Sequence, residues 1–272
     1  MEGWSDEKQI HPQMKIRRRI FLRRIFCTSI FIAAISLCLA PPAFAQKVVV
    51  ASTTLAGAIA KAAGAGEVRI IAPPEMSHPP EYDVKPSDLM KLRGAVVAVY
   101  GGYEKMVPRL VETSGSQGVV TLPIDTRTSP ENLMEQARKI AKVLDTEQQE
   151  LAWESRFKER LSELQGKLSA FSGKRAVVHR QAEPFARFAG LQVLKLLSPG
   201  ELTPKTIAES IALKPDVVID ILHLPLAGVI AENAKCPYLR IINFPGVEGT
   251  KTLEDIFEYN TNQLIKAMKV GG

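Results

Sequence analysis

The sequence predicts an α/β protein with two lobes, each a mostly parallel β-sheet flanked by helices, joined by one long linking α-helix. Three observations support this fold class. Short apolar runs alternate with helical patterns in the first part of the chain, a long helical pattern follows, and the alternation then repeats. Apolar runs of this kind are typical of parallel strands, because helices cover both faces of such a sheet.

The alternation in residues 46–129 indicates the first lobe. Pro86 opens one of its helices, where the missing N–H of a proline costs little. Strands are expected at 48–51, 68–71, 96–100 and 119–122, and helices at 55–63, 86–91 and 106–113.

Residues 130–172 form the predicted linking helical region. Apolar residues recur there at helical spacing, over Leu133–Leu144 and again over Leu151–Leu168. Thr146 and Gln149 have the spacing of a capping box. Glycine is nearly absent from this stretch, so we expect a rigid connector.

Residues 173–272 repeat the alternation and indicate the second lobe. The whole pattern predicts two small sheets joined by a stiff helix, with a cleft between them. Strands are expected at 176–178, 191–196, 217–221 and 239–242, and helices at 184–189, 204–213, 227–234 and 253–268.

Residues 1–45 have the pattern of a secretory signal peptide, with Met1 or Met14 as the start. A basic region precedes an apolar run over Ile25–Ala40, and small residues then occupy the positions that a signal peptidase reads, ending at Ala45. The alternative is a transmembrane anchor, but the run is short for a span of ~20 residues. Leu37 before a cysteine is too large for a lipid-attachment motif. We therefore expect cleavage after residue 45 and an unanchored periplasmic protein.

Removal of this segment changes the charge and the cysteine content. Residues 1–45 hold seven of the 35 Lys and Arg and three of the 29 Asp and Glu, which leaves a net charge of +2. No basic patch interleaved with aromatic residues remains, which argues against nucleic acid as a partner. Cys236 is then the sole cysteine, so a disulfide framework is excluded. It precedes a strand and is expected to be a small buried residue.

Polar residues gather after the predicted strands, where ligands bind in open parallel sheets. All three histidines of residues 46–272 follow or end a strand, and imidazole with carboxylate suits zinc, manganese or iron. A lone loop histidine is more often solvated or hydrogen-bonded to the backbone. The prediction of a metal site therefore depends on the joint placement of the three histidines. The candidate metal ligands are His78, Asp125, His179, His223, Glu81 and Asn243.

Enzymatic chemistry has little support in the sequence. No G-x-S-x-G elbow, P-loop or H-E-x-x-H motif is present. The glycines after the first strand lack the spacing of a dinucleotide-binding fingerprint. An exported enzyme is therefore the least favoured class, for want of a nucleophile with its base.

Four segments resemble the manganese/zinc solute-binding family, the periplasmic metal-binding subunits (cluster A-I) of ABC importers. They cover nearly all of the chain after residue 45 and keep the order of the family. The resemblance implies two lobes, one linking helix, no catalysis, and delivery of a divalent metal ion by a monomer to an inner-membrane permease and its ATPase. The segments are Pro79–Asp88 (PPEYDVKPSD), Val99–Glu104 (VYGGYE), Lys174–Leu191 (with HRQAEPFARFAGL) and Gly246–Met268.

The metal ligands of this family carry over only in part. The family uses three histidines, the third sometimes a glutamate, and a late acidic residue, and only His179 stands at its position. Pro80 replaces the first histidine, Asp125 aligns with the second, and Asn243 aligns with the late acid. His223 falls where the family commonly has a glutamate, and the acidic, histidine-rich loop of many zinc importers is absent.

Two hypotheses follow from these departures. In the first, His78, His179 and His223 with Asp125 or Glu81 rebuild a site for a divalent metal, with zinc as the expected ion and manganese or iron as alternatives. Its affinity would fall as the histidines protonate below about pH 6.5. In the second, the metal site is lost, and the protein binds another small solute or a metal chelate, or is an accessory protein.

Overall fold

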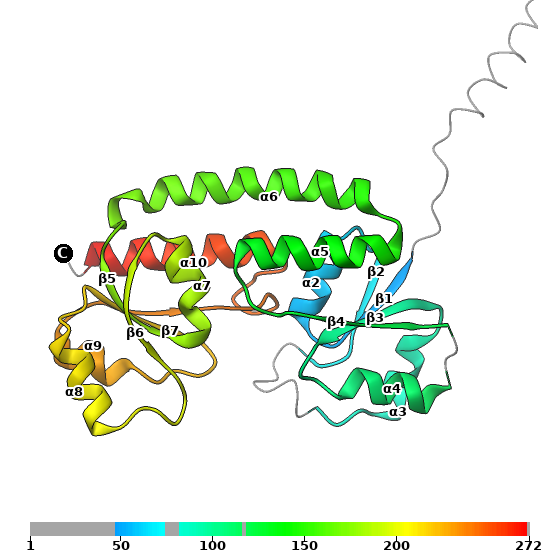
Figure 1. Ribbon diagram of the computed structural model, residues 1–272, viewed down its shortest axis with the longest axis horizontal. Coiled ribbons are helices and arrows are strands. Elements are labelled where there is room, and N and C mark those ends of the chain that lie inside the picture. Colours follow the sequence, from blue (N-terminus) through cyan, green and yellow to red (C-terminus); the bar gives the residue numbers. More distant parts are fainter. Residues whose placement is uncertain (1–46, 74–81, 116–117, 271–272) are drawn as a thin grey trace, which may run out of the picture. The chain divides into compact units, whose positions relative to one another are not determined.

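The computed structural model describes residues 47–73, 82–115 and 118–270 (Figure 1). The predicted signal peptide, residues 1–45, lies outside them. Residues Gln46–Gly272 form one compact unit, to which the following description applies. Within the described ranges, no helix has the length and apolar content that a membrane span requires.

Two four-stranded parallel sheets form the framework. In the first, the strands follow the order β2-β1-β3-β4, and in the second the order β6-β5-β7-β8, so the two sheets share one topology. The strands are β1 (Val48–Ala51), β2 (Glu67–Ile70), β3 (Ala95–Gly101), β4 (Val120–Ile124), β5 (Arg175–His179), β6 (Gln192–Leu197), β7 (Val217–Ile221) and β8 (Tyr238–Ile241).

Helices flank both sheets, as expected. Each predicted strand and helix occurs within two residues of its expected bounds, and the α/β fold class is confirmed. The helices are α2 (Thr54–Ala62), α3 (Pro86–Leu89), α4 (Met106–Ser114), α5 (Pro130–Leu144), α6 (Glu147–Leu168), α7 (Glu183–Phe188), α8 (Pro204–Ala212), α9 (Gly228–Ala234) and α10 (Leu253–Val270), with 3-10 turns at 90–92, 169–171 and 180–182.

The linking helix is α6, with 22 residues (Figure 1). The helical region before it is a separate helix, α5, which ends at Asp145 in the left-handed conformation (φ 49°). The predicted capping box is wrong, because the Thr146 hydroxyl donates to the Ala63 carbonyl (2.5 Å) instead of capping α6. This turn packs so closely on the end of α2 that a Cβ at Gly64 would lie 2.8 Å from Gln149 Cβ.

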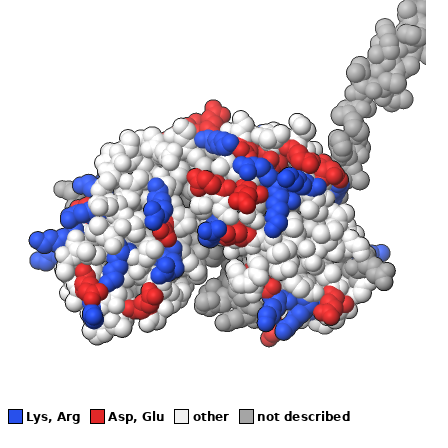
Figure 2. All heavy atoms as spheres, viewed as in Figure 1, with Lys and Arg blue, Asp and Glu red and all other residues white. Residues whose placement is uncertain are grey.

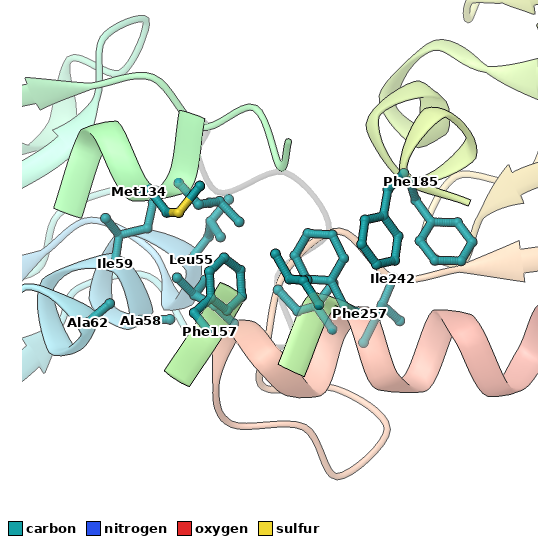
Figure 3. Packing of buried hydrophobic residues seen from close by; sticks show 14 of the residues in the cluster. Leu55, Ala58, Ile59, Ala62, Met134, Phe157, Phe185, Ile242 and Phe257 are labelled. Atoms are coloured by element: carbon teal, nitrogen blue, oxygen red, sulfur yellow. The ribbon is translucent and has the colours of Figure 1, made fainter. Parts of the chain in front are cut away.

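One apolar core runs through both sheets and the helices that link them (Figure 3). Trp153 stacks on Phe157 with ring centroids 4.8 Å apart, and Phe157 meets Phe257 of α10 edge-on at 5.7 Å. Phe257 in turn contacts Phe188 of α7 at 5.0 Å. A chain of aromatic rings therefore joins α6, α7 and α10.

Acidic and basic side chains are interspersed over α5 and α6 on the face shown in Figure 2. Glu154 of α6 accepts from Arg138 of α5 (2.8 Å) and from Lys158 (2.5 Å). The Arg138–Glu154 pair connects the linking helix to α5 on its polar side, while its apolar side faces the core.

Candidate metal site at the strand ends

Each sheet has a topological switch point, which lies between β1 and β3 in the first and between β5 and β7 in the second. Chain connections leave in opposite directions at such a point, so the carboxyl ends of these strands border a crevice where ligands bind. Ser52 follows β1, Glu104 follows β3 and His179 ends β5. All three side chains are buried.

Glu104 is a buried carboxylate that the sequence did not single out as a site residue. Its Oε2 accepts from the Gly101 N–H (3.1 Å), and Oε1 makes no hydrogen bond with any described residue. Burial raises the pKa of Glu104, and the Ser52 hydroxyl and the Gly101 N–H oppose that rise. A Cβ at residue 101 would lie 3.1 Å from Oε1, so glycine permits this approach. The sequence feature that could have identified Glu104 is its place in the VYGGYE segment.

His179 is 1% exposed, and its ring lies at the end of β5. Nδ1 accepts from the Gln181 N–H (3.1 Å), and Nε2 has no hydrogen bond among the described residues. Burial lowers the pKa of His179, and the charge of Asp220 opposes this shift. With Nδ1 as acceptor, the neutral ring carries its proton on Nε2. Binding a cation through Nε2 therefore requires this proton to leave Nε2.

Asn243 follows β8 and is linked to His179 through Gln181. Its Nδ2 donates to Gln181 Oε1 (3.3 Å), while Oδ1 is buried without a hydrogen bond among the described residues. His223 follows β7, with its ring centroid 5.1 Å from that of Phe244. The structure thus brings His179 and Asn243 to one region of the second sheet.

Asp125 follows β4 and is bound within its own loop. Its Oδ2 contacts the Arg127 guanidinium (2.5 Å to Nη2 and 2.7 Å to Nε), and its Oδ1 accepts from the Arg127 N–H (2.9 Å). Arg127 lowers the pKa of this carboxyl, against a smaller rise from burial. Asp125 would have to leave this ion pair to bind a metal.

The described residues do not assemble a complete metal shell. No three of their His, Cys, Asp and Glu side chains come close enough together to hold an ion, so Asp125, His179 and His223 do not form one group. His78 and Glu81 lie outside the described residues, and the six-residue set stays a prediction.

Buried polar atoms without partners nevertheless mark these strand ends. Glu104 Oε1, His179 Nε2 and Asn243 Oδ1 are three such atoms among the described residues. Burying a polar atom without a hydrogen bond costs free energy, so such atoms are rare. Oxygen and imidazole nitrogen atoms are suitable ligands for a divalent cation.

Comparison with known families agrees with this chemistry. Residues 49–216 match the model of the family described as zinc-uptake complex component A, periplasmic. A search of curated proteins finds no match.

Solved structures share the fold at low sequence identity. A periplasmic metal-binding protein from Candidatus Liberibacter asiaticus is 15% identical, with a TM-score of 0.62 over 82% of this chain and 100% of its own. The solute-binding protein FpvC from Pseudomonas aeruginosa in complex with Ni²⁺ is 17% identical, with a TM-score of 0.63 over 84% of this chain and 98% of its own. FpvC in complex with Mn²⁺ is also 17% identical, with a TM-score of 0.62 over 84% and 99%.

Proposed function

The chain belongs to the periplasmic zinc-uptake component A family, and from this premise we propose that it captures a divalent metal ion and delivers it to an ABC permease. The observation that carries the proposal is His179, an imidazole buried at the end of β5 with its Nε2 unbonded among the described residues. The topology places it at the switch point of its sheet. Family membership and the fold support capture and release without catalysis.

The proposed ion is zinc, with manganese or iron as alternatives. Imidazole favours zinc, whereas added carboxylate and amide oxygens suit manganese. FpvC, which shares the fold, has been solved with Ni²⁺ and with Mn²⁺. The proposed partners are an inner-membrane permease and its ATPase, and the proposed form is a periplasmic monomer, residues 46–272. Its proposed parts are a first lobe (46–129), a linking region (130–172) and a second lobe (173–272).

The proposed ligands come from both lobes. His78, Glu81 and Asp125 belong to the first, and His179, His223 and Asn243 to the second. Binding would require Asp125 to exchange Arg127 for the metal, and His179 to present an unprotonated Nε2. A cation bound there would satisfy buried atoms that otherwise lack partners.

A second candidate function is binding of another small solute or a metal chelate, or an accessory role. Asn243 favours it, because an amide contributes no negative charge where a carboxylate is expected from the family. The pairing of Asp125 with Arg127 points the same way. A site with fewer charged ligands would hold a bare cation weakly.

The test is a thermal-shift series on metal-free residues 46–272 with zinc, manganese, iron and nickel, together with metal analysis of the purified protein. A ligand present at 100 times its Kd stabilises the folded state by about 2.7 kcal/mol, which is a shift of several degrees. We expect one or more ions to give such a shift in the wild type, and none to do so in His179→Ala.

Since His179 is buried, direct titration by calorimetry separates lost binding from lost stability. Lys205→Ala, with its side chain 86% exposed on α8, is the control. If no ion raises the melting temperature of the wild type, the metal proposal fails and the solute proposal is favoured.

A further inference from the structure

A cavity of about 550 Å³ lies beside β8 and α10, and none of the proposed metal ligands among the described residues lines it. Tyr259, Gln263 and Lys266 of α10 contribute to it from one face of the helix, since they are four and three residues apart. Tyr238 and Arg240 of β8 form the facing side. Its volume is in the range of small-molecule sites, roughly 300–1,000 Å³.

Among the residues that the structure describes, the charged ones that line this cavity are all basic, and no Asp or Glu lines it. They are Lys235, Arg240 and Lys266, all exposed. The ion pairs found in the described part of the chain include none of the three. Their charge is therefore available to a ligand.

The phenols of Tyr238 and Tyr259 lie near the guanidinium of Arg240. Burial raises the pKa of both tyrosines, and the positive charge of Arg240 opposes the rise in each. Two acidic side chains interact with these phenols. Asp220 is buried and accepts from the Tyr238 hydroxyl (3.0 Å), and Glu248 interacts with Tyr259. Both acids are engaged by tyrosine, and neither lines the cavity.

The outer edge of β8 adds backbone hydrogen-bonding groups. The N–H groups of Val218 and Leu222 donate to the carbonyls of Pro237 and Ile241, so alternate residues of β8 face β7. By this alternation, the backbone groups of Tyr238 and Arg240 point to the open edge of the sheet. Leu239, which is buried, and Leu222 give the cavity an apolar wall.

We propose that this cavity binds a small organic anion that carries carboxylate groups on an apolar body. Arg240 and Lys266 bind the carboxylates from opposite sides, and Lys235 adds a third positive charge. Arginine suits this role because its planar fork matches a carboxylate. The leucine side chains cover the apolar part of the ligand. The site is separate from the proposed metal site and does not depend on it.

The test uses Cys236, which lines the cavity and is the sole cysteine of residues 46–272; it is half-buried in the structure and not fully buried as expected. The probe is phthalate, which bears two carboxylates on a benzene ring, and its neutral match is dimethyl phthalate. We expect phthalate to slow the reaction of Cys236 with an uncharged maleimide in a saturable way, at constant ionic strength. Dimethyl phthalate should have no effect.

Two variants locate the site, and calorimetry measures the affinity of each for phthalate. Arg240→Gln and Lys266→Gln should each weaken binding about tenfold or more, because a charge-assisted hydrogen bond is lost. Lys205→Gln, an exposed lysine on α8, should leave the affinity unchanged. Lys266 is exposed near the end of its helix, so its variant tests the site even if the Arg240 variant fails to fold.

Three results would overturn the proposal. The first is the absence of saturable protection by phthalate. The second is equal protection by dimethyl phthalate, which would show apolar binding without charge recognition. The third is equal weakening in Lys205→Gln, which would show a general effect of net charge. A thermal shift with metal ions that stays the same in the Arg240 and Lys266 variants would confirm that the two sites are separate.

Discussion

The role of Asn243 in the proposed metal site can be tested directly by substitution. It stands two residues after β8, and its buried Oδ1 is an acceptor without a hydrogen bond in the described part of the chain. A cation would satisfy this oxygen, yet the amide brings no charge to the cation. The family resemblance implies an acidic residue at this position.

Asn243→Asp is therefore expected to have two opposite effects. It should raise the affinity for a divalent cation about tenfold, because the carboxylate adds a negative charge in a buried place. It should also lower the melting temperature of the metal-free protein, because a buried carboxylate without a cation is poorly solvated. Calorimetric titration and thermal unfolding measure the two effects separately.

The matched control is Asn233→Asp, at an exposed position on α9. This change should alter neither the affinity nor the stability by much. A loss of metal-free stability in Asn243→Asp without any gain in affinity would remove Asn243 from the proposed ligands.

Sequence reasoning placed these residues correctly along the chain. His179, His223, Asp125 and Asn243 all follow or end strands, as apolar runs and the parallel-sheet rule predicted. Their partners could not be predicted. The Arg127 ion pair and the Gln181 contacts depend on loop conformations that no periodic pattern encodes.

At the scale of elements, α6 carries a buried carboxylate pair, Glu150 and Glu154, and Arg138 of α5 donates to Glu154. Glu150 is 2% exposed, and its Oε1 has no hydrogen bond among the described residues. Burial and the neighbouring Glu154 raise the pKa of Glu150 to about 7. Arg138 and Lys158 lower the pKa of Glu154 to about 2. Glu150 is therefore protonated more readily in the folded chain than in the unfolded one.

Glu150→Gln is expected to stabilise the protein above pH 7, by on the order of 1 kcal/mol. In the wild type, the folded state binds the extra proton between the unfolded pKa near 4.5 and the folded pKa of about 7. Stability from this residue is thus complete below pH 4.5 and is lost as the pH rises to about 7. Glutamine cannot ionise, so this loss should disappear.

Urea denaturation at pH 5 and pH 8 measures this difference. Glu147→Gln at the exposed start of α6 is the control, and it should keep the pH dependence of the wild type. A loss of stability between pH 5 and pH 8 that is as large in Glu150→Gln as in the wild type would contradict the assignment.

The boundary between α5 and α6 shows why the capping-box rule, which considers only residues near in sequence, failed there. Thr146 and Gln149 satisfy the spacing of a capping box, but the end of α2 offers the Ala63 carbonyl to the Thr146 hydroxyl. A contact between residues 83 positions apart replaced a contact within the helix. Helical periodicity predicted that both helices exist, because each buries one apolar face.

At the scale of the whole unit, the two sheets are joined by packing as well as by the chain. The aromatic side chains of Trp153, Phe157, Phe188 and Phe257 lie in the core shared by α2, α6, α7 and α10. Phe157 and Phe257 are seen in Figure 3. Sequence patterns predicted the lobes and the linking helix but not this shared core, because apolar periodicity shows that a face is buried without showing what covers it.

Because one core serves both sheets, residues 46–272 are expected to unfold in a single transition. Phe257→Ala should lower the free energy of unfolding by about 3–5 kcal/mol, since Phe257 is 2% exposed and contacts two other rings. Trp153, the sole tryptophan after residue 45, reports on this core by fluorescence, while far-ultraviolet circular dichroism reports on all helices. The two signals should coincide in the wild type.

Leu151→Ala, at an exposed site on α6, is the control and should change the free energy of unfolding by less than about 1 kcal/mol. Separate transitions in the wild type would show that the lobes fold independently and that the shared core contributes little to their coupling.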